Sequence, residues 1–435
     1  MKNTVIEKLY NYYLSSSGIC TDTRQLIKNS IYFALKGPNF DGNNYAEDAI
    51  AKGAKLSVVD DFSLKDKSND ILYVEDVLDT LQGLAIYHRG KLDIPVIGLT
   101  GSNGKTTTKN LMGKVLALKY KVAATKGNLN NHIGVPLTIL GIKDYHDIAI
   151  VEMGASAVGE IELLSKISRP TIGMITNISN AHVEGFENLE GVIRGKSELF
   201  DFLLKNGGKV IINNEDEIIN NFSKRFKDPI NLTGEGSIVN VQLIESVPSL
   251  KFKIRGDIFE SPLFGDYNFQ NILFALVIAK VFEIDLKQAS LEVSKYSPED
   301  NRSEKIYEKS NCIILDSYNA NPKSMSNAIK SINRFPNKNK VVILGDMNEL
   351  GSEAKLEHEK IGALTKQLEI EKCFFVGKNM KYAHQKNKSS LWFVDRNSLE
   401  NEILNHKIRK ADILIKGSRS FELEMILPLV KRISV

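Results

Sequence analysis

Short apolar runs alternate with helix-like stretches over most of this chain. In its central part, an apolar run at Val96–Thr100 leads into Gly101-Ser-Asn-Gly104. Leu111, Val115 and Leu118 then recur at the spacing of one helix face, which predicts a helix that buries those three side chains. Strands of parallel sheets are buried on both faces and read as continuous apolar runs. The alternation therefore indicates parallel sheets covered by helices.

The apolar runs fall into two groups, and each group predicts one α/β domain. The strands expected in the first group are Val96–Thr100, Ile148–Val151, Ile172–Ile175 and Val210–Ile212. Those expected in the second group are Cys312–Leu315, Val341–Leu344, Cys373–Val376, Leu391–Val394 and Ile413–Ile415. Residues 1–83 carry their own strand-like runs at Ser30–Leu35 and Lys55–Val59, which predict a smaller mixed domain.

Charge and hydropathy narrow the function classes. The 435 residues contain 57 Lys and Arg against 53 Asp and Glu, a net charge of +4 that is too weak to favour a surface for nucleic acid. The longest apolar run, Ile272–Ala279, falls far short of the ~18 residues that a membrane span needs. We therefore expect no nucleic-acid partner and no membrane insertion. Any phosphate group should bind at one site formed by a few residues and not on a broad basic surface.

The amino terminus and the cysteines favour a cytoplasmic protein. Glu7 and Lys8 stand where a secretory signal would have its apolar core. Cys20, Cys312 and Cys373 are odd in number, scattered and never in a CxxC pattern, so we expect three reduced thiols. A monomer is the expected oligomeric state.

The strongest chemical signal is a glycine-rich loop between an expected strand and an expected helix. It reads Gly98-Leu-Thr-Gly-Ser-Asn-Gly-Lys-Thr-Thr-Thr108. Backbone N–H groups and a helix N-terminus bind phosphate oxygens in such loops, the lysine reaches the outer phosphates, and the hydroxyl after it ligates Mg²⁺. The full GxxxxGK[ST] pattern has glycine where this chain has Leu99, so the loop is a variant. The expected nucleotide ligands are Gly101, Ser102, Asn103, Gly104, Lys105, Thr106 and Thr107.

These signals predict an α/β protein of three domains. We expect a small mixed α/β domain at 1–83, a central parallel-sheet ATPase domain of the phosphate-loop type at 84–304, and a Rossmann-like domain at 305–435.

Two further candidates follow strand-like runs in the central domain. Glu152 comes directly after Ile148–Val151, and His182 lies in TNISNAHVEGF after Ile172–Ile175. Ligands of open α/β sheets bind beyond the carboxyl ends of the strands, and a carboxylate there suits Mg²⁺. A helix cap for Glu152 and a structural hydrogen bond for His182 stay open as alternatives.

Three polar segments follow strands of the second group: DSYNANP (316–322), LGDMNELG (344–351) and KGSR (416–419). Asp316 is a candidate acceptor for a ribose hydroxyl, although Asn, Ser and Pro also form ordinary turns. Three such segments at one edge of one sheet favour a cleft lining over three independent turns.

Motifs along nearly the whole chain resemble those of one family, in the same order. They are TDTR (21–24), TGSNGKTT, GNLNNHIGVP (127–136), VEMGAS, TNISNAHVEGF, GKSELF (195–200), DSYNANP, LGDMNELG and KGSR. This set resembles the Mur ligases of peptidoglycan synthesis. GNLNNHIGVP, DSYNANP and LGDMNELG are most similar to the member that joins D-alanyl-D-alanine to UDP-N-acetylmuramoyl-tripeptide.

The resemblance implies an ATP-dependent carboxylate–amine ligase that works through an acyl phosphate. It implies substrate contacts at Thr23, Arg24 and Asn44 for the UDP end and at Asn130 and Asn131. Ser418 and Arg419 are candidates for D-alanyl-D-alanine, because an arginine suits a terminal carboxylate. The third residue of the tripeptide, lysine or diaminopimelate, stays open.

For ATP and metal, the resemblance implies two Mg²⁺ sites and a set of contacts. Thr106 and Glu152 would hold one ion, and His182 and a carbamylated Lys196 would help to hold the second. Lys105, His182, Lys196 and Arg302 are the expected catalytic residues. Asn268, Asn271, Arg302, Asp316, Tyr318 and Asn319 would contact the nucleotide. Tyr267 and Asn43 stand where relatives often carry His, and Asn301 where Gly is usual.

Other readings of the same residues predict different products. A folylpolyglutamate synthase would share the ligase chemistry, and a small-molecule kinase would share only the phosphate loop. A non-catalytic nucleotide-binding regulator would need only the loop, so the joint presence of Lys105, Thr106, Glu152, His182 and Lys196 argues against it.

Overall fold

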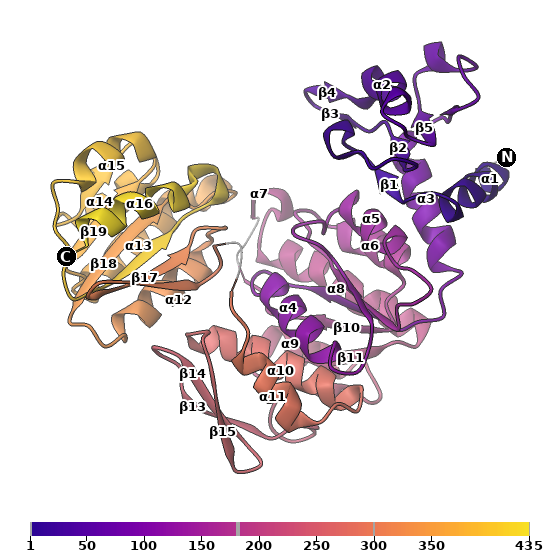
Figure 1. Ribbon diagram of the computed structural model, residues 1–435. Coiled ribbons are helices and arrows are strands. Elements are labelled where there is room, and N and C mark those ends of the chain that lie inside the picture. The colour runs from indigo at the N-terminus through magenta and orange to yellow at the C-terminus, as the bar shows by residue number, and fades with distance from the viewer. Residues whose placement is uncertain (1, 180–182, 299–300, 435) are drawn as a thin grey trace.

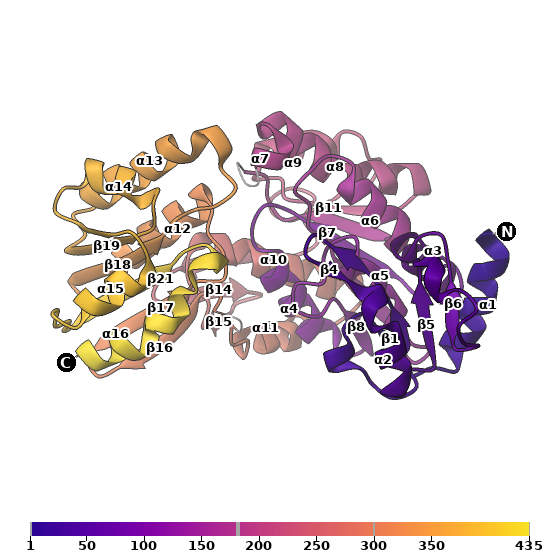
Figure 2. The ribbon, with the colours of Figure 1, turned by 90° about the horizontal axis from the view of Figure 1, so that it is seen from above.

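The computed structural model describes residues 2–179, 183–298 and 301–434, and these residues fold into three α/β domains (Figure 1). The predicted fold class is confirmed. The two chain ends lie at opposite sides of the molecule, with the central domain between the other two (Figure 2). The boundaries 1–83, 84–304 and 305–435 stay predictions.

A parallel sheet with strand order β1-β2-β5-β6 forms the N-terminal domain, and β3 pairs with β4 in a separate hairpin. The strands are β1 (Ile19–Cys20), β2 (Ile31–Phe33), β3 (Lys36–Gly37), β4 (Phe40–Asp41), β5 (Leu56–Val59) and β6 (Ile71–Tyr73). The helices are α1 (Lys2–Leu14), α2 (Ala46–Ala51) and α3 (Val77–Arg89). The two strand-like runs predicted for this domain contain β2 and β5.

A parallel sheet with strand order β12-β11-β10-β7-β9-β8 forms the central domain. Its strands are β7 (Val96–Thr100), β8 (Val122–Ala124), β9 (Ile148–Glu152), β10 (Ile172–Ile175), β11 (Lys209–Ile212) and β12 (Ile230–Asn231). The helices that follow these strands are α4 (Lys105–Leu116), α5 (Gly134–Leu140), α6 (Glu160–Ser168), α7 (Val183–Phe186), α8 (Leu189–Asn206) and α9 (Glu217–Ser223). Because β7 lies between β9 and β10, the loops after these three strands meet at one edge of the sheet.

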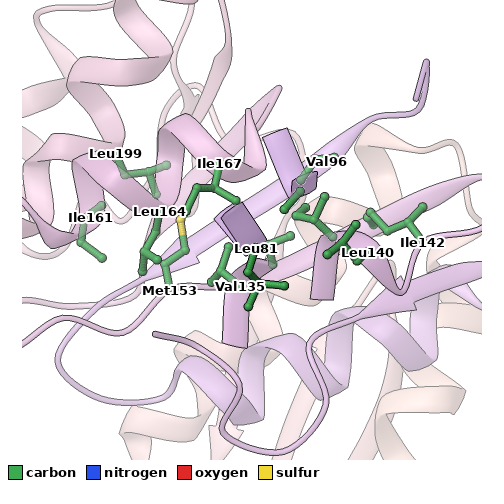
Figure 3. Close-up of a cluster of buried hydrophobic side chains, with 14 of the residues drawn as sticks. Leu81, Val96, Val135, Leu140, Ile142, Met153, Ile161, Leu164, Ile167 and Leu199 are labelled. Atoms are coloured by element: carbon green, nitrogen blue, oxygen red, sulfur yellow. The ribbon is translucent and has the colours of Figure 1, made fainter. Parts of the chain in front are cut away.

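Helices cover both faces of the central sheet. On one face α3, α5, α6 and α8 bury a cluster that includes Leu81, Leu140, Leu164 and Leu199 (Figure 3). On the other face α4 packs against α10 (Asp266–Val281) and α11 (Leu286–Ser294). The longest apolar run lies within α10 and is buried on all sides, which explains why it has no polar face.

An antiparallel sheet was not predicted. It consists of β13 (Val241–Glu245), β14 (Leu250–Ile254) and β15 (Asp257–Ser261), and it packs on α10 and α11. The alternation Leu250-Lys-Phe-Lys-Ile254 carries the signal, since its apolar side chains are buried and alternate with more exposed lysines.

The C-terminal sheet has the strand order β16-β17-β21-β18-β19-β20, parallel except for the edge pair β16–β17. Its strands are β16 (Glu304–Glu308), β17 (Asn311–Asp316), β18 (Asn339–Gly345), β19 (Lys372–Val376), β20 (Leu391–Phe393) and β21 (Ala411–Lys416). Its helices are α12 (Pro322–Asn333), α13 (Ala354–Gln367), α14 (Met380–Lys386), α15 (Arg396–Ile403) and α16 (Leu427–Ile433). As predicted, the three polar segments follow the ends of adjacent strands β17, β21 and β18.

One detail of the predicted packing is wrong. Leu118 does not extend the buried face of α4, because the helix ends at Leu116 and the chain turns there toward β8. Leu118 lies in that turn and is 40% exposed. No helix within the described residues is long and apolar enough to cross a bilayer.

Candidate active site

A cavity of about 1080 Å³ lies between the central and C-terminal domains. Polar side chains from both domains line it, and most of the residues predicted from the sequence are among them. They are Ser102, Asn103, Gly104, Lys105, Thr106, Thr107, Asn130, Asn131, Glu152, Asn268, Asn271, Arg302, Asp316, Tyr318 and Asn319.

The phosphate loop needs glycine at two places. Gly101 has a φ of +146°, and a β-carbon there would lie 2.0 Å from Thr176 Oγ1. Gly104 has a φ of +80°, and a β-carbon there would lie 2.5 Å from Asn271 Oδ1. Leu99, in contrast, is a fully buried residue of β7. The variant loop therefore begins after the strand and keeps glycine where close contacts require it.

The N-terminus of α4 faces the cavity without a side-chain cap. The first N–H groups of a helix have no intrahelical partner, so they can receive an anion. Lys105 Nζ donates to Gly101 O at 2.7 Å and thus folds back over the loop. Burial lowers the pKa of Lys105, and the nearby Glu152 carboxylate opposes this shift. An anionic ligand would favour the charged form of this lysine.

Glu152 ends β9 and is 1% exposed. Its Oε1 accepts hydrogen bonds from Thr106 Oγ1 at 3.2 Å and from Asn130 Nδ2 at 2.9 Å. Its Oε2 has no hydrogen-bond partner among the described residues, and Lys109 Nζ lies 3.7 Å away. A buried carboxylate oxygen without a donor, next to a hydroxyl, suits a hard cation.

Lys196 lies on α8 just behind the cavity wall and is 1% exposed. Its Nζ donates to Ala155 O at 3.4 Å and lies over the Phe186 ring, 5.2 Å from the centroid. Burial, together with the charge of Lys105, lowers the pKa of Lys196 to about 7. A large fraction of this amine is therefore uncharged and nucleophilic at neutral pH.

The C-terminal wall presents Arg302 and Tyr318. The guanidinium carbon of Arg302 lies 3.5 Å from the centroid of the Tyr318 ring. Arg302 Nε is buried and has no hydrogen-bond partner within the described ranges. An unpaired buried donor at the cavity suits an anionic ligand.

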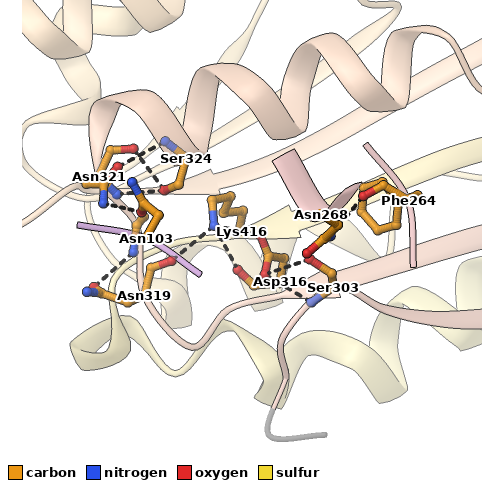
Figure 4. A network of polar contacts seen from close by, with 10 residues as sticks. Asn103, Phe264, Asn268, Ser303, Asp316, Asn319, Asn321, Ser324 and Lys416 are labelled. Carbon is orange, nitrogen blue, oxygen red and sulfur yellow. Dashed lines mark hydrogen bonds and ion pairs between the residues drawn. The ribbon is translucent and has the colours of Figure 1, made fainter. Parts of the chain in front are cut away.

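Asp316 is already engaged by its neighbours (Figure 4). Its Oδ1 accepts from the Ser303 N–H at 3.0 Å, and its Oδ2 accepts from Lys416 Nζ at 2.6 Å. A ribose hydroxyl would have to share these oxygens. Asn268 and Asn271 are likewise engaged, since Asn271 Nδ2 donates to Asn268 Oδ1 at 2.9 Å.

The remaining predicted residues lie elsewhere. Thr23 and Arg24 lie in a 3-10 turn of the N-terminal domain, where Arg24 pairs with Asp22 at 2.7 Å, and Asn44 is exposed in another. Ser418 is buried and its Oγ accepts from the Asn348 N–H at 2.9 Å, while Arg419 pairs with Glu424. None of these residues lines the cavity. His182 lies outside the described residues.

Comparison with known proteins agrees with this architecture. The Mur ligase middle domain matches residues 99–279, and the Mur ligase glutamate ligase domain matches residues 301–419. The chain is 34% identical over 424 residues to the UDP-N-acetylmuramoyl-tripeptide–D-alanyl-D-alanine ligase of Bacillus subtilis. The aligned residues cover 94% of this chain and 92% of that protein. The chain belongs to the Mur ligase family. The predicted family is thereby confirmed.

Solved structures of Mur ligases have the same arrangement. MurF from Acinetobacter baumannii has a TM-score of 0.85 at 29% identity, covering 95% of this chain and 93% of that one. MurF ligase from Thermotoga maritima in complex with ADP has a TM-score of 0.84 at 25% identity, covering 97% of this chain and 98% of that one. ATP use by this Mur ligase follows from its family.

The structure adds residues at the cavity whose roles sequence reasoning missed. Lys416 lines the cavity as part of the KGSR segment that was predicted to line a cleft, but its own role was not predicted, and Lys109, which contacts Glu152, was missed altogether. Lys416 ends an otherwise apolar strand, and Lys109 follows Lys105 by four residues on the same face of α4. Lysine is rarely buried unless it is paired, so Lys416 and Lys109, each on a face expected to be buried, could have been recognised from the sequence as candidates for a polar site.

Proposed function

We propose that this Mur ligase joins D-alanyl-D-alanine to UDP-N-acetylmuramoyl-tripeptide, with ATP as the energy source. The products are UDP-N-acetylmuramoyl-pentapeptide, ADP and phosphate. The observation that best supports this proposal is the cavity itself. The phosphate loop forms one of its walls, and Arg302 lies in the opposite wall, on the C-terminal side. The names of the similar ligases supply the substrates.

Joining a carboxylate to an amine in water requires a leaving group on the carboxylate. The terminal carboxylate of the tripeptide attacks the γ-phosphate of ATP, which forms an acyl phosphate and releases ADP. The amine of D-alanyl-D-alanine then attacks the acyl carbon, and the tetrahedral intermediate collapses to the amide and phosphate. Both steps need water to be excluded, because the acyl phosphate hydrolyses.

The first step brings two anions together, so cationic groups and alignment dominate its barrier. Lys105 lies at the phosphate loop, and Arg302 Nε, on the opposite wall, has no hydrogen-bond partner among the described residues. The N–H groups at the N-terminus of α4 have no side-chain cap, so they would donate hydrogen bonds to phosphate oxygens of ATP. In other phosphoryl-transfer enzymes, an arginine that stabilises transition-state charge contributes on the order of 10³–10⁵ in rate.

The donor set fits Mg²⁺. Thr106 and Glu152 would supply oxygen ligands to the ion, since Glu152 Oε2 lacks a hydrogen-bond donor among the described residues. A bound Mg²⁺ would neutralise phosphate charge during transfer. A second Mg²⁺ would be held with the help of His182 and of Lys196 in its carbamylated form. The low pKa of Lys196 supports the carbamate, because carbon dioxide reacts with the uncharged amine.

The other predicted contacts complete the proposal. Thr23, Arg24 and Asn44 would bind the UDP end in the N-terminal domain, and Asn130 and Asn131 the substrate in the central one. Ser418 and Arg419 would bind D-alanyl-D-alanine, while the nucleotide would contact the phosphate loop, Asn268, Asn271, Arg302, Asp316, Tyr318 and Asn319. We further propose that the protein acts as a monomer in the cytoplasm.

The test is incubation of the purified protein with ATP, Mg²⁺ and UDP-N-acetylmuramoyl-tripeptide, with and without D-alanyl-D-alanine. We expect a UDP-linked pentapeptide by mass spectrometry and release of phosphate, both dependent on the dipeptide. A phosphorylated stable product would favour a kinase instead. Lys105→Ala should abolish turnover and leave binding of the UDP substrate intact, whereas Lys114→Ala, an exposed position on the same helix, should change neither.

A further inference from the structure

Lys416 is buried at the carboxyl end of β21, where it lines the cavity. Its side chain is 3% exposed. The Nζ donates to Asp316 Oδ2 at 2.6 Å, to Asn319 O at 3.0 Å and to Asp316 O at 3.5 Å (Figure 4). An ammonium group has three N–H donors. Two of them make short bonds within this segment, and the contact with Asp316 O lies at the long limit of a hydrogen bond.

These three acceptors belong to one short segment, Asp316–Asn319. It includes Tyr318, whose ring lies against the Arg302 guanidinium at 3.5 Å. The same segment is joined to Ser303, because the Ser303 N–H donates to Asp316 Oδ1 at 3.0 Å. Lys416 thus ties the end of its own strand to the residues that hold Arg302 at the cavity wall.

We propose that Lys416 is a positioning residue for the nucleotide: it holds the Asp316–Asn319 segment so that Tyr318 and Arg302 present a preformed surface to ATP. This proposal rests on the proposed function, and it adds a residue that acts through others. Direct contact with phosphate would compete with the short bonds that Lys416 makes to Asp316 Oδ2 and Asn319 O. If ATP binding had to order this segment, the loss of conformational entropy would lower the affinity for ATP. A segment that is already ordered before binding avoids this cost.

The same sheet contains a matched control. Lys340 Nζ contacts Asp412 Oδ2 at 2.7 Å, with side-chain exposures of 8% and 0%. Like Lys416, it also donates to backbone oxygens, here those of Phe335 and Asn337. This pair joins β18 to β21 near their amino ends, and neither Lys340 nor Asp412 lines the cavity. Removing Lys340 therefore removes a comparable buried pair from the same domain without touching the cavity wall.

The experiment compares Lys416→Met with Lys340→Met in the full-length protein. ADP and ATP affinity are measured by calorimetric titration, steady-state kinetics give KM for ATP and kcat, and urea unfolding gives stability. We expect both variants to lose stability and only Lys416→Met to weaken nucleotide affinity, by about tenfold or more, as a misplaced contact does. KM for ATP should rise more than kcat falls, and KM for D-alanyl-D-alanine should change little.

Lys416→Arg serves as the second variant if Lys416→Met does not fold. It keeps the cation but cannot match the spacing of the three acceptors, so its ATP affinity should fall while its unfolding free energy stays closer to that of the unchanged protein. Equal nucleotide affinity in the Lys416 and Lys340 variants would overturn the positioning role. Failure of the unchanged protein to bind ATP would instead overturn the proposed function itself.

Discussion

Asn321 Nδ2 donates a hydrogen bond of 2.6 Å to Asn103 Oδ1, across 218 positions of sequence (Figure 4). Asn103 belongs to the phosphate loop, and Asn321 begins α12 of the C-terminal domain. The bond therefore joins the two walls of the cavity. Asn321 also caps α12, since its Oδ1 accepts from the Ser324 N–H at 2.9 Å.

Asn321→Ser separates these two roles. Serine retains the helix cap but is too short to reach Asn103, so stability should stay within about 0.5 kcal/mol while kcat falls several-fold. Asn321→Ala should lose the cap as well, at about 1 kcal/mol. Urea unfolding and steady-state turnover provide the measurements. Full activity of Asn321→Ser would mean that the bond between the domains does not support catalysis.

Lys196→Ala should lose most of its turnover and regain part of it when short carboxylates are added, because they replace the oxygen ligands of a carbamate. Activity of the unchanged enzyme should fall as the pH drops through about 7, since protonation removes the amine that reacts with carbon dioxide. Lys205→Ala, an exposed position on the same helix, is the control. Full activity of Lys196→Ala without added carboxylate would reduce Lys196 to a structural residue.

Tyr267→Phe should leave the ligand-free protein as stable as before or up to about 1 kcal/mol more stable. The Tyr267 hydroxyl is buried near the Ser303 side chain but has no well-formed hydrogen bond among the described residues, so its removal relieves a desolvation cost. Burial and the nearby Asp316 charge raise the pKa of this phenol, and its interaction with Ser303 opposes the rise. The control is Tyr13→Phe, which loses a 2.5 Å bond to Leu140 O and should be destabilised. Urea unfolding compares the two, and a large loss in Tyr267→Phe would reveal a missed partner.

The buried His88 should make the protein less stable at acidic pH. Its Nε2 donates to Ile142 O at 3.0 Å, and its Nδ1 accepts from the Tyr10 hydroxyl at 3.1 Å, so the fold holds the neutral ring. Burial lowers the pKa of His88 below its usual 6.5. As the pH falls below 6.5, His88 becomes protonated in the unfolded chain but stays neutral in the folded one. The unfolded state is thereby favoured, and stability is lost.

Unfolding in urea at pH 7.5 and pH 5.5 tests this dependence. His88→Gln should lower stability at pH 7.5 and show a smaller further loss at pH 5.5 than the unchanged protein. His132→Gln, at an exposed position, should keep the full pH dependence. If the stability of His88→Gln depended on pH as strongly as that of the unchanged protein, the loss at acidic pH would come from groups other than His88.

Sequence reasoning reached the features that are encoded in neighbouring residues. The parallel strands followed from apolar runs, and the phosphate loop followed from glycines, Lys105 and Thr106 in one continuous segment. Beyond the loop, Glu152, His182 and Asp316 followed from their places after strand-like runs, and the other site residues came from a family resemblance. The roles of all of them stay predictions. The β13–β15 sheet was missed although its alternation was present, while Leu118 was misplaced because helix ends depend on where the next strand must begin.

The class of fold, the phosphate loop and the family could all be predicted from local patterns in the sequence. Which side chains contact one another depends on the folded structure. Lys416 meets Asp316 across 100 positions, and Asn321 meets Asn103 across 218. The lowered pKa of Lys196 likewise exists only because packing removes its amine from water. The reason is physical: local patterns encode backbone geometry, whereas burial and electrostatics depend on how distant segments pack together.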